Sequence, residues 1–120
     1  MKNLWTTIKV KDMEASLDFY TNILNLEIDN KMKPSEDMEI VFLCKGETKL
    51  ELVYNLSEKN ILYNGNVSTG FSVDSVDEYI EYLKTKNVSI LEGPFQPNPN
   101  VRFFYINDPN GYKIQLVEQC

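Results

Sequence analysis

An approximate internal repeat restricts the fold of this chain more than any other feature of its sequence. Residues 5–10 match residues 68–73 at a displacement of 63, and residues 49–53 match residues 113–117 at a displacement of 64. Identities are few, but the expected strands and helices follow the same order in both halves, with the same parity of apolar side chains. We therefore predict two β-α-β-β-β modules, over about 4–54 and 68–118, joined by a linker over about 55–67 that contains Asn64-Gly65.

The first module begins with the alternation that is typical of a half-buried strand, over about 4–10. A helix is expected over about 12–25, where Asp12 is suited to cap the N-terminus and apolar side chains recur at helical spacing. Extended segments are expected near 26–31, 38–45 and 48–54. The last two are joined around residues 45–47.

The second module repeats this order, with a strand near 68–73 and a capping box over Ser75–Glu78 that opens a helix ending near Thr85. Extended segments are expected near 88–91, 101–106 and 111–118. Residues 108–111, Asp-Pro-Asn-Gly, suit a type I turn between the last two. The Pro-rich segment 92–100 is expected to be a loop, either a plain connection or a lid.

Strand parity assigns the side chains to two faces, because alternate residues of a strand point to opposite sides. The face toward the helices is expected to carry apolar residues: Ile8, Val10, Leu50, Leu52, Phe71, Val73, Ile114 and Leu116. The opposite face then carries a more polar set: Trp5, Thr7, Lys9, Glu51, Val53, Ser68, Gly70, Ser72, Gln115 and Val117. Polar groups around one large aromatic residue are what a curved, solvated sheet face would show.

The composition excludes several classes of function. The chain has no histidine, which excludes a His general base, a Ser/His or Cys/His nucleophile pair and an imidazole metal ligand. The net charge of −6 disfavours a nucleic-acid partner. No apolar stretch approaches the roughly 20 residues that span a bilayer, and no signal peptide is evident, so we expect a cytoplasmic protein without a membrane partner.

Two segments at opposite ends of the chain resemble the vicinal oxygen chelate superfamily of glyoxalases, bleomycin-resistance proteins and extradiol dioxygenases. Residues 10–20, followed by Leu24-Asn25-Leu26, are similar to the signature of the first module, and residues 108–118 to the closing hairpin. The resemblance implies an α+β fold in which two βαβββ modules form curved, cup-shaped mixed or antiparallel sheets. It also implies a homodimer, because single-domain members usually pair and share their cups.

The same resemblance identifies the positions at which metal-dependent members, such as lactoylglutathione lyase, hold their ion. These positions lie on the first and fourth strands of each module, commonly as His, Glu, His and Glu. The matching residues here are Trp5, Glu51, Ser68 and Gln115. Because a first-row divalent ion needs three or four N, O or S donors, and only Glu51 is charged, we expect no metal cofactor. A weak Mg²⁺ held by Glu51 and several waters is the alternative.

These four residues and Arg102 are candidates for ligand binding. Trp5 either stacks on a planar or cationic ligand as an aromatic wall, or has a structural role in which it fills the cup or packs in a dimer interface. Glu51 either contacts a ligand, with catalysis as a further option, or pairs with one of three lysines: Lys9, Lys49 or Lys113. Ser68 and Gln115 either orient a ligand or simply form hydrogen bonds to each other or to water.

Arg102 either meets a ligand carboxylate or phosphate or has a surface role. Parity does not decide its direction, because residues 103–105 are apolar throughout. Two functions remain open. The leading hypothesis is capture of a small amphipathic ligand in a metal-free cup. The alternative is a lyase, isomerase or dioxygenase-type enzyme of the same superfamily that uses Glu51, with a weak metal or none.

Overall fold

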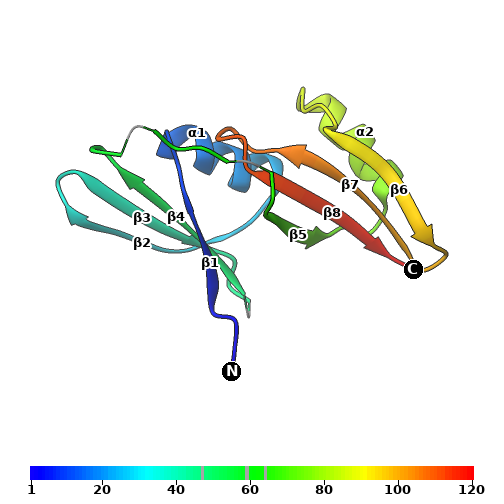
Figure 1. Cartoon of the computed structure of the whole chain (residues 1–120), viewed down its shortest axis with the longest axis horizontal. Coiled ribbons are helices and arrows are strands. Elements are labelled where there is room, and N and C mark those ends of the chain that lie inside the picture. Colours follow the sequence, from blue (N-terminus) through cyan, green and yellow to red (C-terminus); the bar gives the residue numbers. More distant parts are fainter. Residues whose placement is uncertain (47, 59, 64) are drawn as a thin grey trace. The chain divides into compact units, whose positions relative to one another are not determined.

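The computed structural model describes residues 1–46, 48–58, 60–63 and 65–120, and the chain divides into two compact units. Unit 1 spans residues 1–62 and unit 2 spans residues 63–120. Each unit contains one helical region and one four-stranded sheet (Figure 1). The expected turn at 45–47 and the expected linker pair 64–65 each include a residue outside the described set, Glu47 and Asn64 respectively.

Unit 1 is a mixed sheet with a helix on one face. Its elements are β1 (Trp5–Lys9), α1 (Met13–Leu17), the π-helical η1 (Asp18–Ile23), β2 (Ile28–Ser35), β3 (Met38–Leu43) and β4 (Lys49–Asn55). The strand order is β1-β4-β3-β2, with β1 parallel to β4 and the other pairs antiparallel. As predicted, Asp12 caps the helix, since its carboxylate accepts a hydrogen bond from the Ala15 N–H at 3.1 Å.

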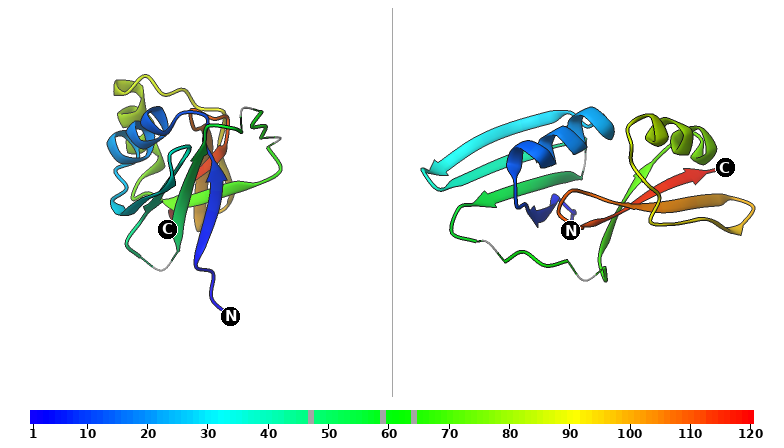
Figure 2. Two further views of the ribbon diagram at one scale, coloured as in Figure 1. Left: turned by 90° about the vertical axis from the view of Figure 1, so that its left-hand side faces the viewer. Right: turned by 90° about the horizontal axis from the view of Figure 1, so that it is seen from above.

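Unit 2 repeats this arrangement, as the two further views show (Figure 2). Its elements are β5 (Ser68–Ser72), α2 (Val76–Thr85), β6 (Glu92–Asn98), β7 (Val101–Asn107) and β8 (Lys113–Gln119), with the strand order β5-β8-β7-β6. The Ser75 hydroxyl accepts a hydrogen bond from the Glu78 N–H at 3.2 Å and so caps α2. No helix among the described residues is long and apolar enough to cross a bilayer.

The segment after α2 corrects two predictions. Residues 92–98 form strand β6 and not a loop or lid, and residues 88–91 contain no strand. β6 is an edge strand whose pairing with β7 shifts register on both sides of Phe95. Proline lacks the N–H of a ladder hydrogen bond, and sheet edges and bulges are where a strand tolerates it. Pro94 and Pro97 therefore fit β6 and do not exclude it.

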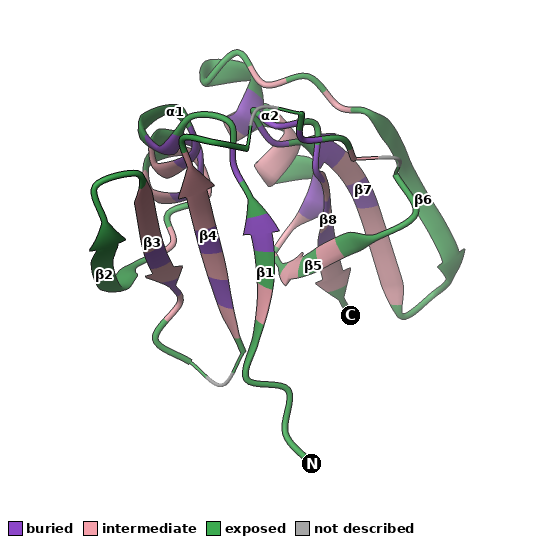
Figure 3. Ribbon diagram, turned by 60° about the vertical axis from the view of Figure 1, so that its left-hand side comes forward, coloured by how far each residue is buried: buried purple, intermediate pink, exposed green. Residues whose placement is uncertain are grey.

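The registers of the two sheets confirm the internal repeat. Trp5 lies opposite Lys49 in unit 1, and Ser68 lies opposite Lys113 in unit 2. The displacement of 63 relates Trp5 to Ser68, and the displacement of 64 relates Lys49 to Lys113. The predicted helix-facing residues of β1, β4 and β8 are buried, and buried positions alternate with less buried ones along β4 (Figure 3). Phe71 and Val73 are only half-buried.

Candidate ligand-binding faces

In unit 1, the face of the sheet away from α1 carries Trp5, Thr7, Phe42 and Glu51, which we call the Glu51 face. The register places Thr7 on one side of Glu51 and Phe42 on the other. The Thr7 hydroxyl donates a hydrogen bond to the Glu51 carboxylate. The Trp5 and Phe42 rings meet edge to face, with centroids 5.2 Å apart, and Trp5 is 46% exposed. This face therefore joins a carboxylate to accessible aromatic surface.

The three lysines considered as partners of Glu51 form ion pairs with other carboxylates. The Lys9 ammonium lies 2.5 Å from a Glu58 oxygen, and the Lys49 ammonium lies 2.6 Å from an Asp29 oxygen. In unit 2, the Lys113 ammonium lies 3.5 Å from a Glu92 oxygen. The structure thus gives Glu51 a neutral hydroxyl as its hydrogen-bond donor.

The corresponding face of unit 2 carries Ser68, Gly70 and Gln115. Gln115 lies between Gly70 and Tyr105 in the register, and its side-chain N–H donates to the Tyr105 hydroxyl at 3.2 Å. A Cβ on Gly70 would approach the Gln115 Oε1 to 3.3 Å, so the glycine leaves room for the amide. Ser68 is exposed at the start of β5. Gln115 therefore has Tyr105 as a partner that sequence reasoning did not identify.

An aromatic row on the same face of unit 2 was also missed. Phe95 on β6, Phe103 and Tyr105 have neighbouring centroids 5.5 Å and 5.7 Å apart, and Phe95 is 44% exposed. The Lys113 ammonium lies 4.2 Å from the centroid of the Tyr105 ring, a cation–π contact. The turn at 108–111 was the signal that could have found this row, because it sets the pairing of β7 with β8 and hence the face of Phe103 and Tyr105.

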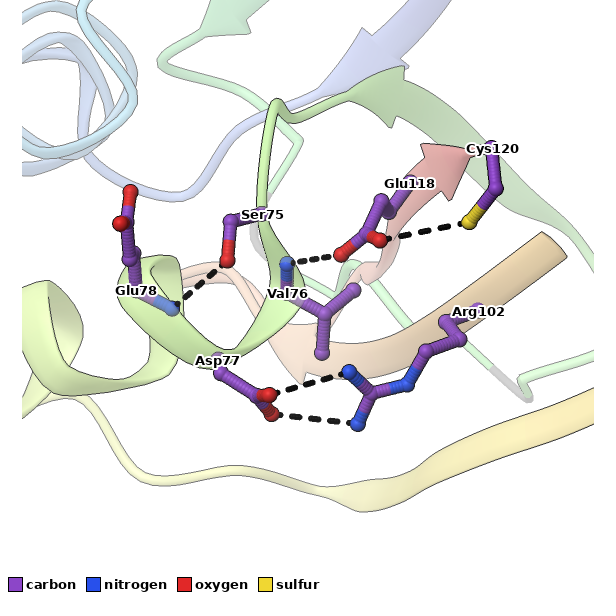
Figure 4. Close-up of polar contacts among 7 residues, drawn as sticks. All are labelled: Ser75, Val76, Asp77, Glu78, Arg102, Glu118 and Cys120. Carbon is purple, nitrogen blue, oxygen red and sulfur yellow. Dashed lines mark hydrogen bonds and ion pairs between the residues drawn. The ribbon is translucent and has the colours of Figure 1, made fainter.

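Arg102 lies on the opposite face of that sheet, toward α2 (Figure 4). Its guanidinium binds the Asp77 carboxylate through two hydrogen bonds of 3.1 Å, which lowers the pKa of Asp77. Beside it, the Glu118 carboxylate accepts the Val76 N–H at 2.7 Å, and this bond lowers the pKa of Glu118. Arg102 thus links the sheet to the helix and lies on the face opposite to Gln115 and Tyr105.

Comparison with known proteins identifies the family. A family model described as Glyoxalase/Bleomycin resistance protein/Dioxygenase superfamily matches residues 3–116. The chain belongs to this superfamily. It is 32% identical over 130 residues to a lactoylglutathione lyase of Escherichia coli O157:H7, covering 99% of this chain and 93% of the relative. A lactoylglutathione lyase of Neisseria meningitidis serogroup B is 31% identical over 127 residues, covering 99% and 91%.

Solved structures of the superfamily share the fold. Glyoxalase I of Leishmania major, described as trypanothione-dependent, matches with a TM-score of 0.84 and 27% identity, covering 98% of this chain and 86% of that one. TnmS3, an antibiotic-binding protein from Streptomyces sp. CB03234, matches with a TM-score of 0.79 and 21% identity, covering 100% and 97%. The predicted glyoxalase/bleomycin-resistance fold, with two four-stranded mixed sheets, is confirmed.

The residues at the four matched positions do not fit the metal ion that the superfamily implies. Indole nitrogen is not a metal ligand, and Ser68 and Gln115 offer neutral oxygens, so Glu51 is the one charged donor of the four. In the part of the chain that the structure describes, no three Cys, Asp or Glu side chains gather in a group that could hold an ion. We therefore derive no chemistry through a metal at these positions.

Proposed function

We propose that this superfamily member binds a small amphipathic molecule on the open faces of its sheets, without a resident metal ion. The observation that carries the proposal is the donor set of the four matched positions: Trp5, Glu51, Ser68 and Gln115. Of these, only Glu51 suits a metal, whereas an indole, a hydroxyl and an amide suit an organic ligand with apolar and polar parts. The antibiotic-binding relative supports the proposal, since it uses the same fold to bind an organic molecule.

Calorimetric titration with Ni²⁺, Zn²⁺ and Mn²⁺ tests the metal-free part of the proposal. The unaltered protein should bind no ion more tightly than roughly millimolar, the range of sites with few charged ligands. Submicromolar binding would contradict the proposal.

A triple variant tests the positional matching on which the proposal depends. Trp5→His, Ser68→His and Gln115→Glu together supply the donor types of the metal-dependent members, and should tighten Ni²⁺ binding by about 100-fold or more. The matched control combines Leu4→His and Val67→His with Gln115→Glu. It adds the same number of imidazoles at the preceding residues, which are exposed and of opposite parity, and should stay at the level of the unaltered protein. Equal affinities of the two variants would show that the matching is wrong.

A second candidate function is catalysis by Glu51, as a lyase, isomerase or dioxygenase-type enzyme with a weak metal or none. The lactoylglutathione lyases that are about a third identical to the chain favour it, as does the retained carboxylate. The test is turnover of a glutathione hemithioacetal with and without added Ni²⁺ or Zn²⁺. Turnover that is lost in Glu51→Gln would favour the enzyme, whereas equal background rates for both proteins would favour the binder.

We also propose that the chain forms a homodimer. Each sheet has two edge strands, and several apolar side chains are exposed, including Ile28 at 37% and Met32 at 42% on the edge strand β2. Edges and apolar patches of this kind are commonly covered by a second chain. Light scattering at micromolar concentration should give about twice the chain mass of 13.9 kDa. A monomer at that concentration would contradict this proposal.

A further inference from the structure

We infer that the ligand of the Glu51 face is an organic cation with a flat apolar body. This inference rests on the proposed function and specifies the chemical class of the molecule that is bound. Three observations support it. They are the uncompensated charge of Glu51, the aromatic surface beside it, and the contact in unit 2 between a lysine and the ring that corresponds to Phe42.

The first observation is the charge of Glu51. Its hydrogen-bond donor is the Thr7 hydroxyl, which orients the carboxylate but does not cancel its charge. Lys49 has the same strand parity two residues away, and its ammonium lies 2.6 Å from Asp29. Lys9, on the neighbouring strand, is paired with Glu58 at 2.5 Å. A half-buried carboxylate whose neighbouring lysines pair with other acids attracts a cation from solution.

The second observation is the aromatic surface beside this carboxylate. Trp5 lies two residues before Thr7 on β1, and its ring reaches the ring of Phe42 on β3, with centroids 5.2 Å apart and planes at 74°. The face of an aromatic ring carries negative electrostatic potential, and tryptophan is the strongest of the three aromatic side chains in cation–π contacts. An anionic ligand would be repelled by both the ring faces and Glu51.

The third observation is the contrast with unit 2. Tyr105 lies opposite Gln115 in the register, as Phe42 lies opposite Glu51, and the Lys113 ammonium sits 4.2 Å from the Tyr105 ring centroid. Both cation–π contacts found among residues 1–46, 48–58, 60–63 and 65–120 are in unit 2. In unit 2, Lys113 is the cation at the ring, and the neighbouring side chain is the neutral amide of Gln115. In unit 1, the neighbouring side chain is the Glu51 carboxylate, and the rings of Trp5 and Phe42 are available to a cation from solution.

The experiment uses Trp5 as the reporter, because it is the one tryptophan of the chain. Three probes of similar size are titrated while Trp5 emission is followed, with correction for absorption by the probe: N-methylquinolinium as the cation, N-methyl-2-quinolone as the neutral compound and 1-naphthoate as the anion. The cation should bind at least about fivefold more tightly than the other two. Its affinity should also fall as salt is added, because screening weakens the attraction to Glu51.

Two variants separate charge from shape. Glu51→Gln should weaken binding of the cation by about fivefold, and should leave the affinity for the neutral probe unchanged. Glu39→Gln is the matched control, since it removes a negative charge from strand β3 of the same sheet. Glu39 has the same parity as the buried residues Val41 and Leu43, so it lies on the helix-facing side and not on the Glu51 face. This control variant should leave the affinity for the cation unchanged. Equal unfolding midpoints for both variants show that folding is unaffected.

The outcomes distinguish this inference from the proposed function. If the neutral probe or the anion binds as tightly as the cation, the inference is overturned while binding of an organic ligand on this face is supported. An equal loss of cation affinity in Glu51→Gln and Glu39→Gln also overturns it, because the effect then comes from overall charge. If none of the probes changes Trp5 emission, both the inference and the placement of the ligand on this face are contradicted.

Discussion

The two units share a strand order and a register, yet they differ at the matched positions of the face opposite the helix. Glu51 corresponds to Gln115, Thr7 to Gly70, Trp5 to Ser68 and Phe42 to Tyr105. One ion pair is shared, since Lys49 pairs with Asp29 as Lys113 pairs with Glu92. Burial thus constrains the helix-facing positions in both units, whereas the open faces differ: unit 1 carries the Glu51 carboxylate where unit 2 carries the neutral Gln115 amide.

A second difference lies between helix and sheet. In unit 2, Arg102 on β7 bridges to Asp77 on α2. The displacement of 63 residues between the modules relates Arg102 to Glu39 and Asp77 to Glu14 in unit 1. Glu39 and Glu14, together with Tyr54, line a pocket of about 540 Å³. Two carboxylates therefore stand in unit 1 where an ion pair stands in unit 2. The Arg102–Asp77 bridge is therefore specific to unit 2.

The largest expected effects concern what the two units share. Leu52 and Leu116 are matched core positions, 0% and 1% exposed. Leu52→Ala and Leu116→Ala should each lower the free energy of unfolding by about 2–5 kcal/mol, because each leaves a cavity in a packed core. Urea denaturation measures both, with Leu62→Ala, at a residue that is 91% exposed, as the control. A loss below about 1 kcal/mol in one unit alone would show that the two cores are not equivalent.

A smaller effect is expected at the turn of unit 2. The buried Asp108 side chain accepts hydrogen bonds from the Asn110 N–H, the Asn110 side-chain amide and the Tyr112 N–H, at 2.9, 3.0 and 2.7 Å. Asp108→Ala should cost about 1–3 kcal/mol of unfolding free energy, because buried donors lose their acceptor. Asp108→Asn keeps one acceptor oxygen and should cost less. Equal losses for the two variants, measured by urea denaturation, would contradict this account of the turn.

These comparisons show which parts of the molecule the sequence could predict. The repeat, the strand parity and both helix caps were predictable, because burial and capping act within a few residues of one another. Strand β6 was missed because its prolines indicate a loop unless the edge position is known. Side-chain parity left the direction of Arg102 open, since residues 103–105 are apolar on both faces: Phe104 is in the core, and Phe103 belongs to the aromatic row. The pairing of β7 with β8 that follows from the turn at 108–111 decides it. The ligand roles of the four matched residues stay predictions.

The Arg102–Asp77 pair predicts a pH dependence that unit 1 should lack. The hydrogen bonds from Arg102 lower the pKa of Asp77 from its ordinary value of 3.8. Because the folded-state pKa is depressed, the pair stabilises the fold above pH 3.8, and this contribution is lost as the pH falls through the folded pKa. Asp77→Asn should therefore lower the melting temperature slightly at neutral pH, with a difference that vanishes in acid. A difference that persists unchanged in acid would contradict this origin. The Asp77 side chain is 73% exposed, so added salt should also reduce the effect.

The smallest effect comes from building the missing bridge in unit 1. Glu39→Arg places a guanidinium opposite Glu14, at the positions that Arg102 and Asp77 occupy in unit 2. It should raise the free energy of unfolding by a few tenths of a kcal/mol at low salt, since exposed ion pairs contribute little. The gain should disappear when Glu14→Gln is added, which a double-mutant cycle measures directly. Glu36→Arg, at an exposed residue between β2 and β3, makes the same change of charge outside the pocket that Glu14 and Glu39 line, and is the control. If Glu39→Arg stabilises no more than this control, the repeat extends to the strands and the helix cap but not to the spacing between helix and sheet.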